Sequence, residues 1–168
     1  AIAAFKQAFS AGEKVGLVLK INSCTAEEIE LLKKELSGIE NVYFLPEVLP
    51  REQVNVLLTS VDAVVSLHRA EGFGLVLAEA MLLGTPTIAT NWSSNTEFMT
   101  KETACLVDYQ LVELTEDIGL FKKGNRWAEP DVKQAADYMR KLYNNPEYCK
   151  SISVNARRYA EEHLSATR

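Results

Sequence analysis

Two glutamates, Glu71 and Glu79, flank a segment that could bind a phosphorylated sugar. Gly72 and Gly74 lie between them, and the residues that follow are apolar except for Glu79. Glycines let the backbone approach a ligand closely, and the free N–H groups of a first helical turn favour an anion. A carboxylate on an otherwise apolar helix needs partners or a ligand, because an unpaired buried charge is very costly. This turn therefore offers donors for a phosphate and acceptors for hydroxyls, which suits a sugar nucleotide.

The elements that position this turn are a strand before it and a helix after it. Apolar runs bounded by turn residues predict a series of strands along the chain, at 15–21, 42–45, 63–67, 87–90 and 104–107. Helical spacing and caps predict helices between them and at the ends, at 1–10, 25–36, 50–60, 74–83, 131–144 and 145–163. Alternating strands and helices predict an α/β fold, a doubly wound, Rossmann-like parallel sheet with helices on both faces.

Ligands of such sheets bind beyond the carboxyl ends of the strands. Polar and glycine-containing segments follow four of the predicted strands, at Lys20, 45–47, 68–74 and 91–95. We expect these segments to converge on one crevice. The stretch 108–125 is long and mixed in composition, and we expect an irregular surface excursion there.

Residues 71–79 resemble the Glu-x7-Glu signature of retaining GT-B glycosyltransferases, the group 1 class known as family 4. The resemblance continues in 84–90, which looks like that family's Gly-x-Pro-hydrophobic strand, and in 41–45, which looks like its preceding strand. Glu97 lies where the family often has a glutamate after a Gly-Gly pair, and 126–131 recurs in some bacterial polysaccharide members. The likeness covers most of the chain.

The resemblance implies that residues 1–168 form one nucleotide-sugar-binding domain, the C-terminal half of a GT-B architecture, truncated at both ends. The family's phosphate-binding Arg and Lys, usually on a first strand and the loop after it, would then fall before Ala1. The implied reaction transfers a hexose, with retention, from a nucleoside-diphosphate sugar to a glycan or lipid-linked acceptor in polysaccharide or glycoconjugate biosynthesis. The acceptor would need the missing N-terminal domain, so we expect the isolated fragment to be inactive.

The same resemblance suggests roles for single residues. Glu71 is predicted to be catalytic, by orienting the hydroxyls of the donor sugar, and Glu79 to bind the ribose. Each has a simpler interpretation, as a solvated loop carboxylate and as a buried glutamate capped by its neighbours. The other predicted donor-binding residues are the glycine-turn residues Gly72, Phe73, Gly74 and Leu75, whose backbone would face the diphosphate, His68 near phosphate or sugar, Lys20 near phosphate or base, and Leu45 and Glu47 beside the nucleobase.

Composition narrows the class of protein. The chain has 168 residues, 47% of them hydrophobic, enough for one domain with a core. Its net charge of −5 argues against a nucleic-acid partner, which normally needs a basic stripe. Three scattered cysteines predict a reducing compartment. We therefore expect a cytoplasmic protein, with any peripheral membrane contact made through the missing domain.

Several chemistries find no support in the sequence. There is no Asp-x-Asp pair, no His and Glu at metal-ligand spacing, no Walker loop and no Gly-x-Ser-x-Gly elbow. We predict no metal and no cofactor besides the donor itself. Two alternatives stay open at this point: a nucleotide-sugar-binding module without transfer activity, and a GT-B-like sugar-nucleotide epimerase. The base, sugar, acceptor and oligomeric state are open as well.

Overall fold

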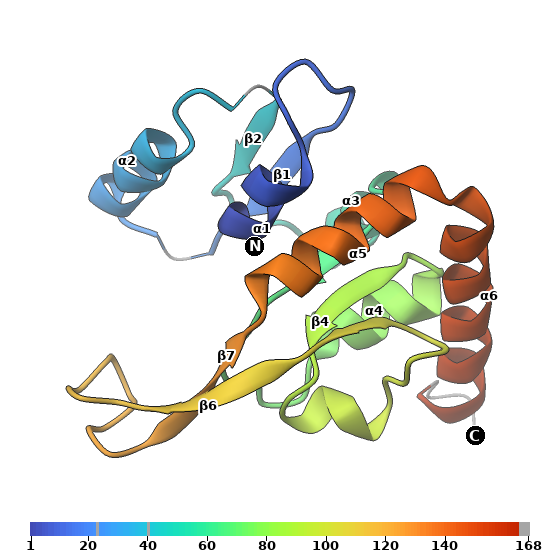
Figure 1. Ribbon diagram of the computed structural model, residues 1–168. Helices are drawn as coiled ribbons and strands as arrows, with labels where there is room; N and C mark the ends of the chain where they lie inside the picture. The colour runs from blue at the N-terminus through green and yellow to red at the C-terminus, as the bar shows by residue number, and fades with distance from the viewer. Residues whose placement is uncertain (23, 40, 165–168) are drawn as a thin grey trace.

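A computed structural model describes residues 1–22, 24–39 and 41–164 (Figure 1). Its helices are α1 Ile2–Ala8, α2 Ala26–Glu35, α3 Arg51–Ser60, α4 Leu75–Leu83, α5 Val132–Asn144 and α6 Pro146–His163, with a short 3-10 helix η1 at Ser94–Glu97. Its strands are β1 Leu17–Lys20, β2 Val42–Leu45, β3 Val64–Ser66, β4 Thr87–Thr90, β5 Cys105–Val107, β6 Tyr109–Glu113 and β7 Arg126–Pro130. None of the described helices is long and apolar enough to cross a membrane.

The first five strands all pair in parallel, as the alternation of strands and helices predicts. β1 pairs with β2, and β4 lies between β3 and β5. We expected one sheet, but among the described residues no backbone ladder joins the two groups.

The core lies on both faces of β4 and β5, which confirms the α/β class. Ile88 and Cys105 belong to a cluster built with α1 and α5. Ala89 and Leu106, the next residues along the same strands, belong to a second cluster built with α4 and α6. Successive side chains of a strand point to opposite faces, so each strand supplies both clusters. The sheet is therefore covered by helices on either side (Figure 1).

Local signals place most of the helix ends correctly. Thr25 and Glu28 form the predicted capping box, the Thr25 Oγ1 accepting the Glu28 N–H at 3.2 Å. Asn145 caps α6 and Pro146 opens it, as expected. Pro50 is the N-cap of α3 and not its first helical residue, a shift of one position.

The expectation of an irregular surface excursion over 108–125 is wrong for residues 109–113, which form β6, whereas residues 114–125 are the connection from β6 to β7. β6 and β7 form an antiparallel hairpin, with Tyr109 opposite Pro130 and Glu113 opposite Arg126, and it extends away from the body (Figure 1). The connection between the strands is too long for a two-residue hairpin turn, which is the signal that sequence reasoning looks for. Ile118 and Phe121 close a small turn inside that connection through mutual backbone hydrogen bonds of 2.9 and 3.0 Å.

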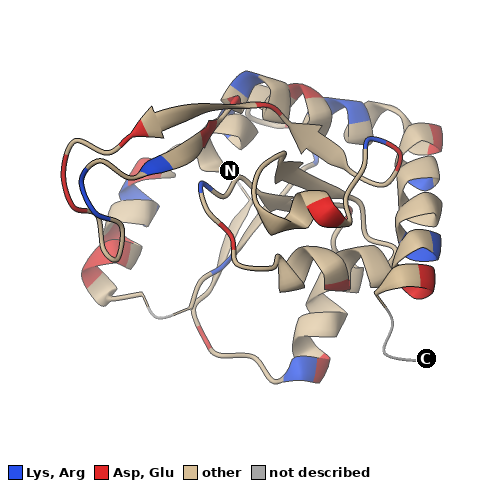
Figure 2. Cartoon of the chain, turned by 90° about the horizontal axis from the view of Figure 1, so that it is seen from below, with Lys and Arg blue, Asp and Glu red and all other residues tan. Residues whose placement is uncertain are grey.

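Charged residues of both signs are distributed over the surface. Figure 2 shows basic and acidic positions interspersed along α6 and along the hairpin. This mixture accompanies the net charge of −5.

Candidate functional site

The glycine turn between β3 and α4 has the predicted strand–turn–helix form. α4 begins at Leu75, and Gly74 precedes it in the left-handed region with φ 85°. A side chain at this position would be strained by that φ, and a Cβ atom would lie 3.3 Å from the Cβ of Asn95. The turn therefore requires glycine, both for its backbone conformation and for its close contact with the loop after β4.

The Glu71 carboxylate folds back onto this turn. Its Oε1 atom accepts the backbone N–H groups of Gly72 at 2.9 Å and Gly74 at 3.1 Å. The N–H groups of Phe73 and Leu75 donate to no acceptor among the described residues. The Glu71 carboxylate thus binds two of the backbone N–H groups that the sequence predicts for an anion. The N–H groups of Phe73 and Leu75 stay available as hydrogen-bond donors.

Two serines hold the Glu71 backbone from the loop after β4. The Ser93 hydroxyl donates to the Glu71 carbonyl oxygen at 2.5 Å, and the Ser94 hydroxyl donates to the Gly72 carbonyl oxygen. Ser93 has a φ of 77°, in the region that favours glycine. The two serines therefore fix this loop against the glycine turn by side-chain hydrogen bonds.

His68 joins the ends of β3 and β4. Its Nδ1 lies 3.1 Å from the Ser66 hydroxyl, and its Nε2 lies 3.0 Å from the Trp92 carbonyl oxygen and 3.1 Å from Asn95 Oδ1. The Asn95 amide is oriented by its own donation from Nδ2 to the Thr90 carbonyl oxygen at 3.0 Å. Nε2 therefore faces two acceptors and must be a donor. Both ring nitrogens of His68 are engaged within the protein, which favours a structural role. Contact between His68 and a sugar nucleotide stays a prediction.

Glu79 has a partner that the sequence did not reveal. The residue is 7% exposed, and its Oε1 atom lies 2.5 Å from Nη1 of Arg51, the first residue of α3. A buried carboxylate indicates that a cation is close. Arg51 lies 28 residues before Glu79, so the sequence alone could not identify which cation it is. The ion pair supports the simpler interpretation of Glu79. The carboxylate has further lone pairs, so ribose binding by Glu79 stays a prediction.

The predicted residues on the other sheet lie apart from this cluster. Lys20 donates from Nζ to Asn22 Oδ1 at 2.5 Å, the Leu45 carbonyl oxygen accepts the Ile21 N–H at 3.1 Å, and Glu47 is exposed. In the described part of the chain, no hydrogen bond or ion pair joins these residues to the glycine turn. Lys20 and Leu45 end β1 and β2, and Glu47 follows β2, but these residues do not share a set of contacts with the glycine turn.

Phe73, in the glycine turn, is both packed and exposed. Its ring packs on Phe98 with centroids 5.4 Å apart, yet about half of the residue is exposed. Leu75 and Val76 beside it are also exposed. The amides of the turn therefore open to solvent through a partly apolar rim.

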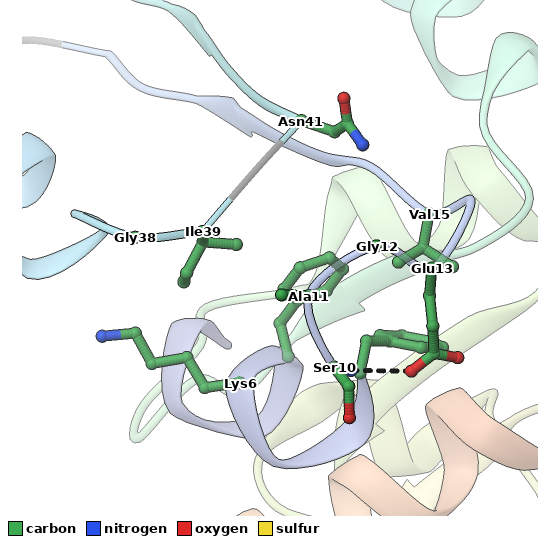
Figure 3. Close-up of a pocket in the computed structure, with 11 residues that line it drawn as sticks. Lys6, Ser10, Ala11, Gly12, Glu13, Val15, Gly38, Ile39 and Asn41 are labelled. Atoms are coloured by element: carbon green, nitrogen blue, oxygen red, sulfur yellow. Dashed lines mark hydrogen bonds between the residues drawn. The ribbon is translucent and has the colours of Figure 1, made fainter.

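A small cavity of about 120 Å³ lies elsewhere in the molecule (Figure 3). Its lining comes from α1, the loop after it and the segment that leads into β2, and includes Phe5, Lys6, Glu13, Val15 and Asn41. Val15 and Asn41 precede β1 and β2, so the cavity lies at the amino ends of these strands. The carboxyl edge, where ligands of such sheets bind, is at the opposite end. The cavity is therefore not part of the candidate site.

Within residues 1–22, 24–39 and 41–164, no group of three or more His, Cys, Asp or Glu side chains could hold a metal ion. What the start of α4 offers is a cluster of backbone amides, the Glu71 carboxylate folded onto them and the buried Glu79 carboxylate one helical turn further along. Such an arrangement can bind an anion and hydroxyl groups together.

Comparisons with known proteins give a family and a fold for the chain. The family model described as "Glycosyl transferases group 1" matches residues 2–159. No curated protein matches the chain in sequence. The fold is similar to that of Anabaena HepE solved with UDP-glucose (20% identity, TM-score 0.73, 98% of this chain and 40% of that one). It is also similar to the C-terminal domain of the group 1 family protein LpcC from Francisella tularensis (18%, 0.76, 99% and 78%).

A third similar structure is sucrose-phosphate synthase from Thermosynechococcus elongatus (21% identity, TM-score 0.71, 96% of this chain and 37% of that one). The chain thus spans about 40% of the length of HepE and of the synthase. At these identities the likeness shows the shared fold.

Proposed function

The chain belongs to the group 1 glycosyl transferases, and we propose that it binds their nucleoside-diphosphate sugar donor at the start of α4. The observation that carries this proposal is the amide turn before α4, where Glu71 Oε1 already binds the N–H groups of Gly72 and Gly74. That contact supports the proposal, because a carboxylate oxygen already accepts two N–H groups of the turn. HepE, which shares the fold, was solved with UDP-glucose, and this supports a sugar nucleotide as the ligand.

The proposed donor contacts follow from the atoms that are available. The diphosphate takes the amides of residues 72–75, including those of Phe73 and Leu75 that have no acceptor among the described residues. Glu71 is displaced from the amides by the diphosphate and turns to the hydroxyls of the transferred sugar. Glu79 keeps Arg51 and offers its remaining lone pairs to the ribose diol.

The proposed reaction is hexosyl transfer with retention. The anomeric carbon loses its bond to the diphosphate oxygen and gains a bond to an acceptor hydroxyl on the same face, and the departing phosphate takes the acceptor proton. Amides aimed at the diphosphate stabilise the charge that develops on it. The reaction then needs no separate enzymatic base and no metal ion, and the acceptor is a glycan or lipid-linked sugar held by a further domain.

Calorimetric titration of the 168-residue chain with nucleoside diphosphates, each with and without a hexose, tests the proposal. We expect at least one pair to bind, and we expect no transfer by this chain alone, because positioning an acceptor needs the opposite domain. If no nucleoside diphosphate or sugar nucleotide binds, the proposed function is wrong. Donor-dependent glycan extension by the isolated chain would contradict the requirement for a second domain.

A further inference from the structure

Arg69, two residues before Glu71, is bound to three consecutive residues of β7. Its Nε and Nη2 atoms donate to the two carboxylate oxygens of Glu129 at 2.6 and 2.9 Å. Its guanidinium carbon lies 4.9 Å from the centre of the Trp127 ring. Its carbonyl oxygen accepts the Ala128 N–H at 3.0 Å. The hairpin therefore binds the Arg69 backbone, pairs its charge and sets the plane of its guanidinium group.

These contacts determine orientation more than stability. The Arg69 and Glu129 side chains are 49% and 41% exposed, and a partly exposed ion pair adds little to the free energy of unfolding. A bidentate pair with a stacked aromatic ring nevertheless restricts the guanidinium to one plane and one direction. The hydrogen bonds to Glu129 also raise the pKa of Arg69 above its ordinary value.

The segment that these contacts hold is the one that carries the proposed donor site. We define the Glu71 loop as residues 67–74, from the end of β3 to the start of α4. Ser93 and Ser94 hold its second half through the carbonyl oxygens of Glu71 and Gly72. Arg69 is the residue through which β7 holds its first half. The loop is thus fixed from two sides by two different segments.

We propose that the β6–β7 hairpin is a positioning element of the donor site, with Arg69 and Glu129 as positioning residues that set the Glu71 loop. This inference rests on the proposed function for its ligand. β7 makes the contacts through residues 127–129, whereas the end of the hairpin between β6 and β7 extends beyond the body (Figure 1) and carries the exposed Leu120. The hairpin therefore contributes to the site through β7, and displacement of β7 would move the carboxylate that caps the amides of α4.

Four variants test the inference: Arg69→Gln, Glu129→Gln, the double variant, and Arg69→Lys, which keeps the charge but loses the fork geometry. The matched control is the pair Glu13 and Arg140, another bidentate ion pair, with distances of 2.5 and 2.6 Å, whose residues lie outside the Glu71 loop. Its variants Glu13→Gln and Arg140→Gln remove the same kind of contact elsewhere in the molecule.

We expect each Arg69 or Glu129 variant to weaken binding of the sugar-nucleotide donor about fivefold, as the loss of roughly 1 kcal/mol implies. The double variant should be no weaker than the single ones, because either change breaks the pair. Backbone amide exchange at Gly72 and Gly74 should become faster in the ligand-free protein, since their bonds to Glu71 depend on the loop. The control variants should lower the melting temperature by about as much as the Arg69 and Glu129 variants do. They should leave the donor affinity and the amide exchange of Gly72 and Gly74 unchanged.

The outcomes separate the two proposals. If the wild-type chain binds the donor and the Arg69 and Glu129 variants bind it equally well, the inference is wrong and the proposed function stands. If the wild-type chain binds no donor, the proposed function fails, and amide exchange at Gly72 and Gly74 decides whether the hairpin holds the loop. Unchanged exchange in every variant would overturn the inference whatever the donor does.

Discussion

The Nη1 atom of Arg51 lies 2.5 Å from Oε1 of Glu79, so the first residue of α3 neutralises a buried carboxylate on α4. The two partners differ in their surroundings: Glu79 is 7% exposed, whereas the Arg51 side chain is 61% exposed. Removing either partner therefore has different consequences, because one leaves a solvated cation and the other leaves a buried anion. This asymmetry separates the binding role of Glu79 from its role in the fold.

Glu79→Gln should keep the fold and weaken nucleotide binding. The amide fills the same space, and Arg51 is exposed enough to be solvated alone. Loss of a charged hydrogen bond to ribose costs about 1.5–3 kcal/mol, which corresponds to roughly ten- to a hundredfold in affinity. The loss should be the same for every ribonucleoside diphosphate. Equal affinities of Glu79→Gln and wild type in calorimetry would show that Glu79 does not bind the ribose.

Arg51→Gln should destabilise the fold more than Glu79→Gln does. It leaves the Glu79 carboxylate buried without its cation, at a cost of about 2–3 kcal/mol in the free energy of unfolding. Urea unfolding of the two single variants and the double variant measures this directly. The double variant should recover most of the loss, because no buried charge is left. A double variant as unstable as Arg51→Gln would contradict this account.

Glu71→Gln should separate the diphosphate from the sugar. The Glu71 carboxylate occupies amides that the diphosphate is proposed to take, so removing its charge should leave the affinity for a bare nucleoside diphosphate equal or higher. Affinity for the sugar-bearing donor should fall, because a charged acceptor for its hydroxyls is lost. The ratio of the two dissociation constants is the measurement, and a ratio unchanged from wild type would refute the proposed sugar contact.

Donor binding should be independent of divalent metal. In the proposed complex, amides at the start of α4 replace a cation at the diphosphate. Titrations with Mg²⁺ and with a chelator should give dissociation constants that agree within about twofold. A tenfold loss of affinity on chelation, about 1.4 kcal/mol, would contradict the prediction.

The stability of the fold should depend on Glu13 at acid pH. The Arg140 guanidinium, and then the Ser10 amide, lower the pKa of Glu13 below its ordinary value by hydrogen bonding to the carboxylate. A lowered pKa contributes stability above the unfolded pKa of about 4.3, and this contribution is lost as the pH falls through the lower folded value. The melting temperature of wild type should therefore exceed that of Glu13→Gln at pH 7 and approach it below about pH 4. A difference that persists at low pH would argue against the ionised pair.

The sequence by itself determined the local structure and the class of fold. Strand periodicity, the Thr25 capping box and the glycine turn at Gly74 act within a few residues, so propensity and backbone sterics suffice to locate them. Alternation of strands and helices then implied parallel pairing, since a parallel strand needs a crossover connection. The resemblance to the family rested on the same local motifs.

Only the tertiary structure decided which distant side chains meet. Arg51 pairs with Glu79 across 28 residues, and Arg69 pairs with Glu129 across 60. Nothing local distinguishes these two arginines from the other basic residues, because the choice is made by how α3 packs on α4 and how β7 lies beside the Glu71 loop. The hairpin was missed for the same reason: its strands are joined by a connection with no short turn signal, and only pairing across that distance forms it.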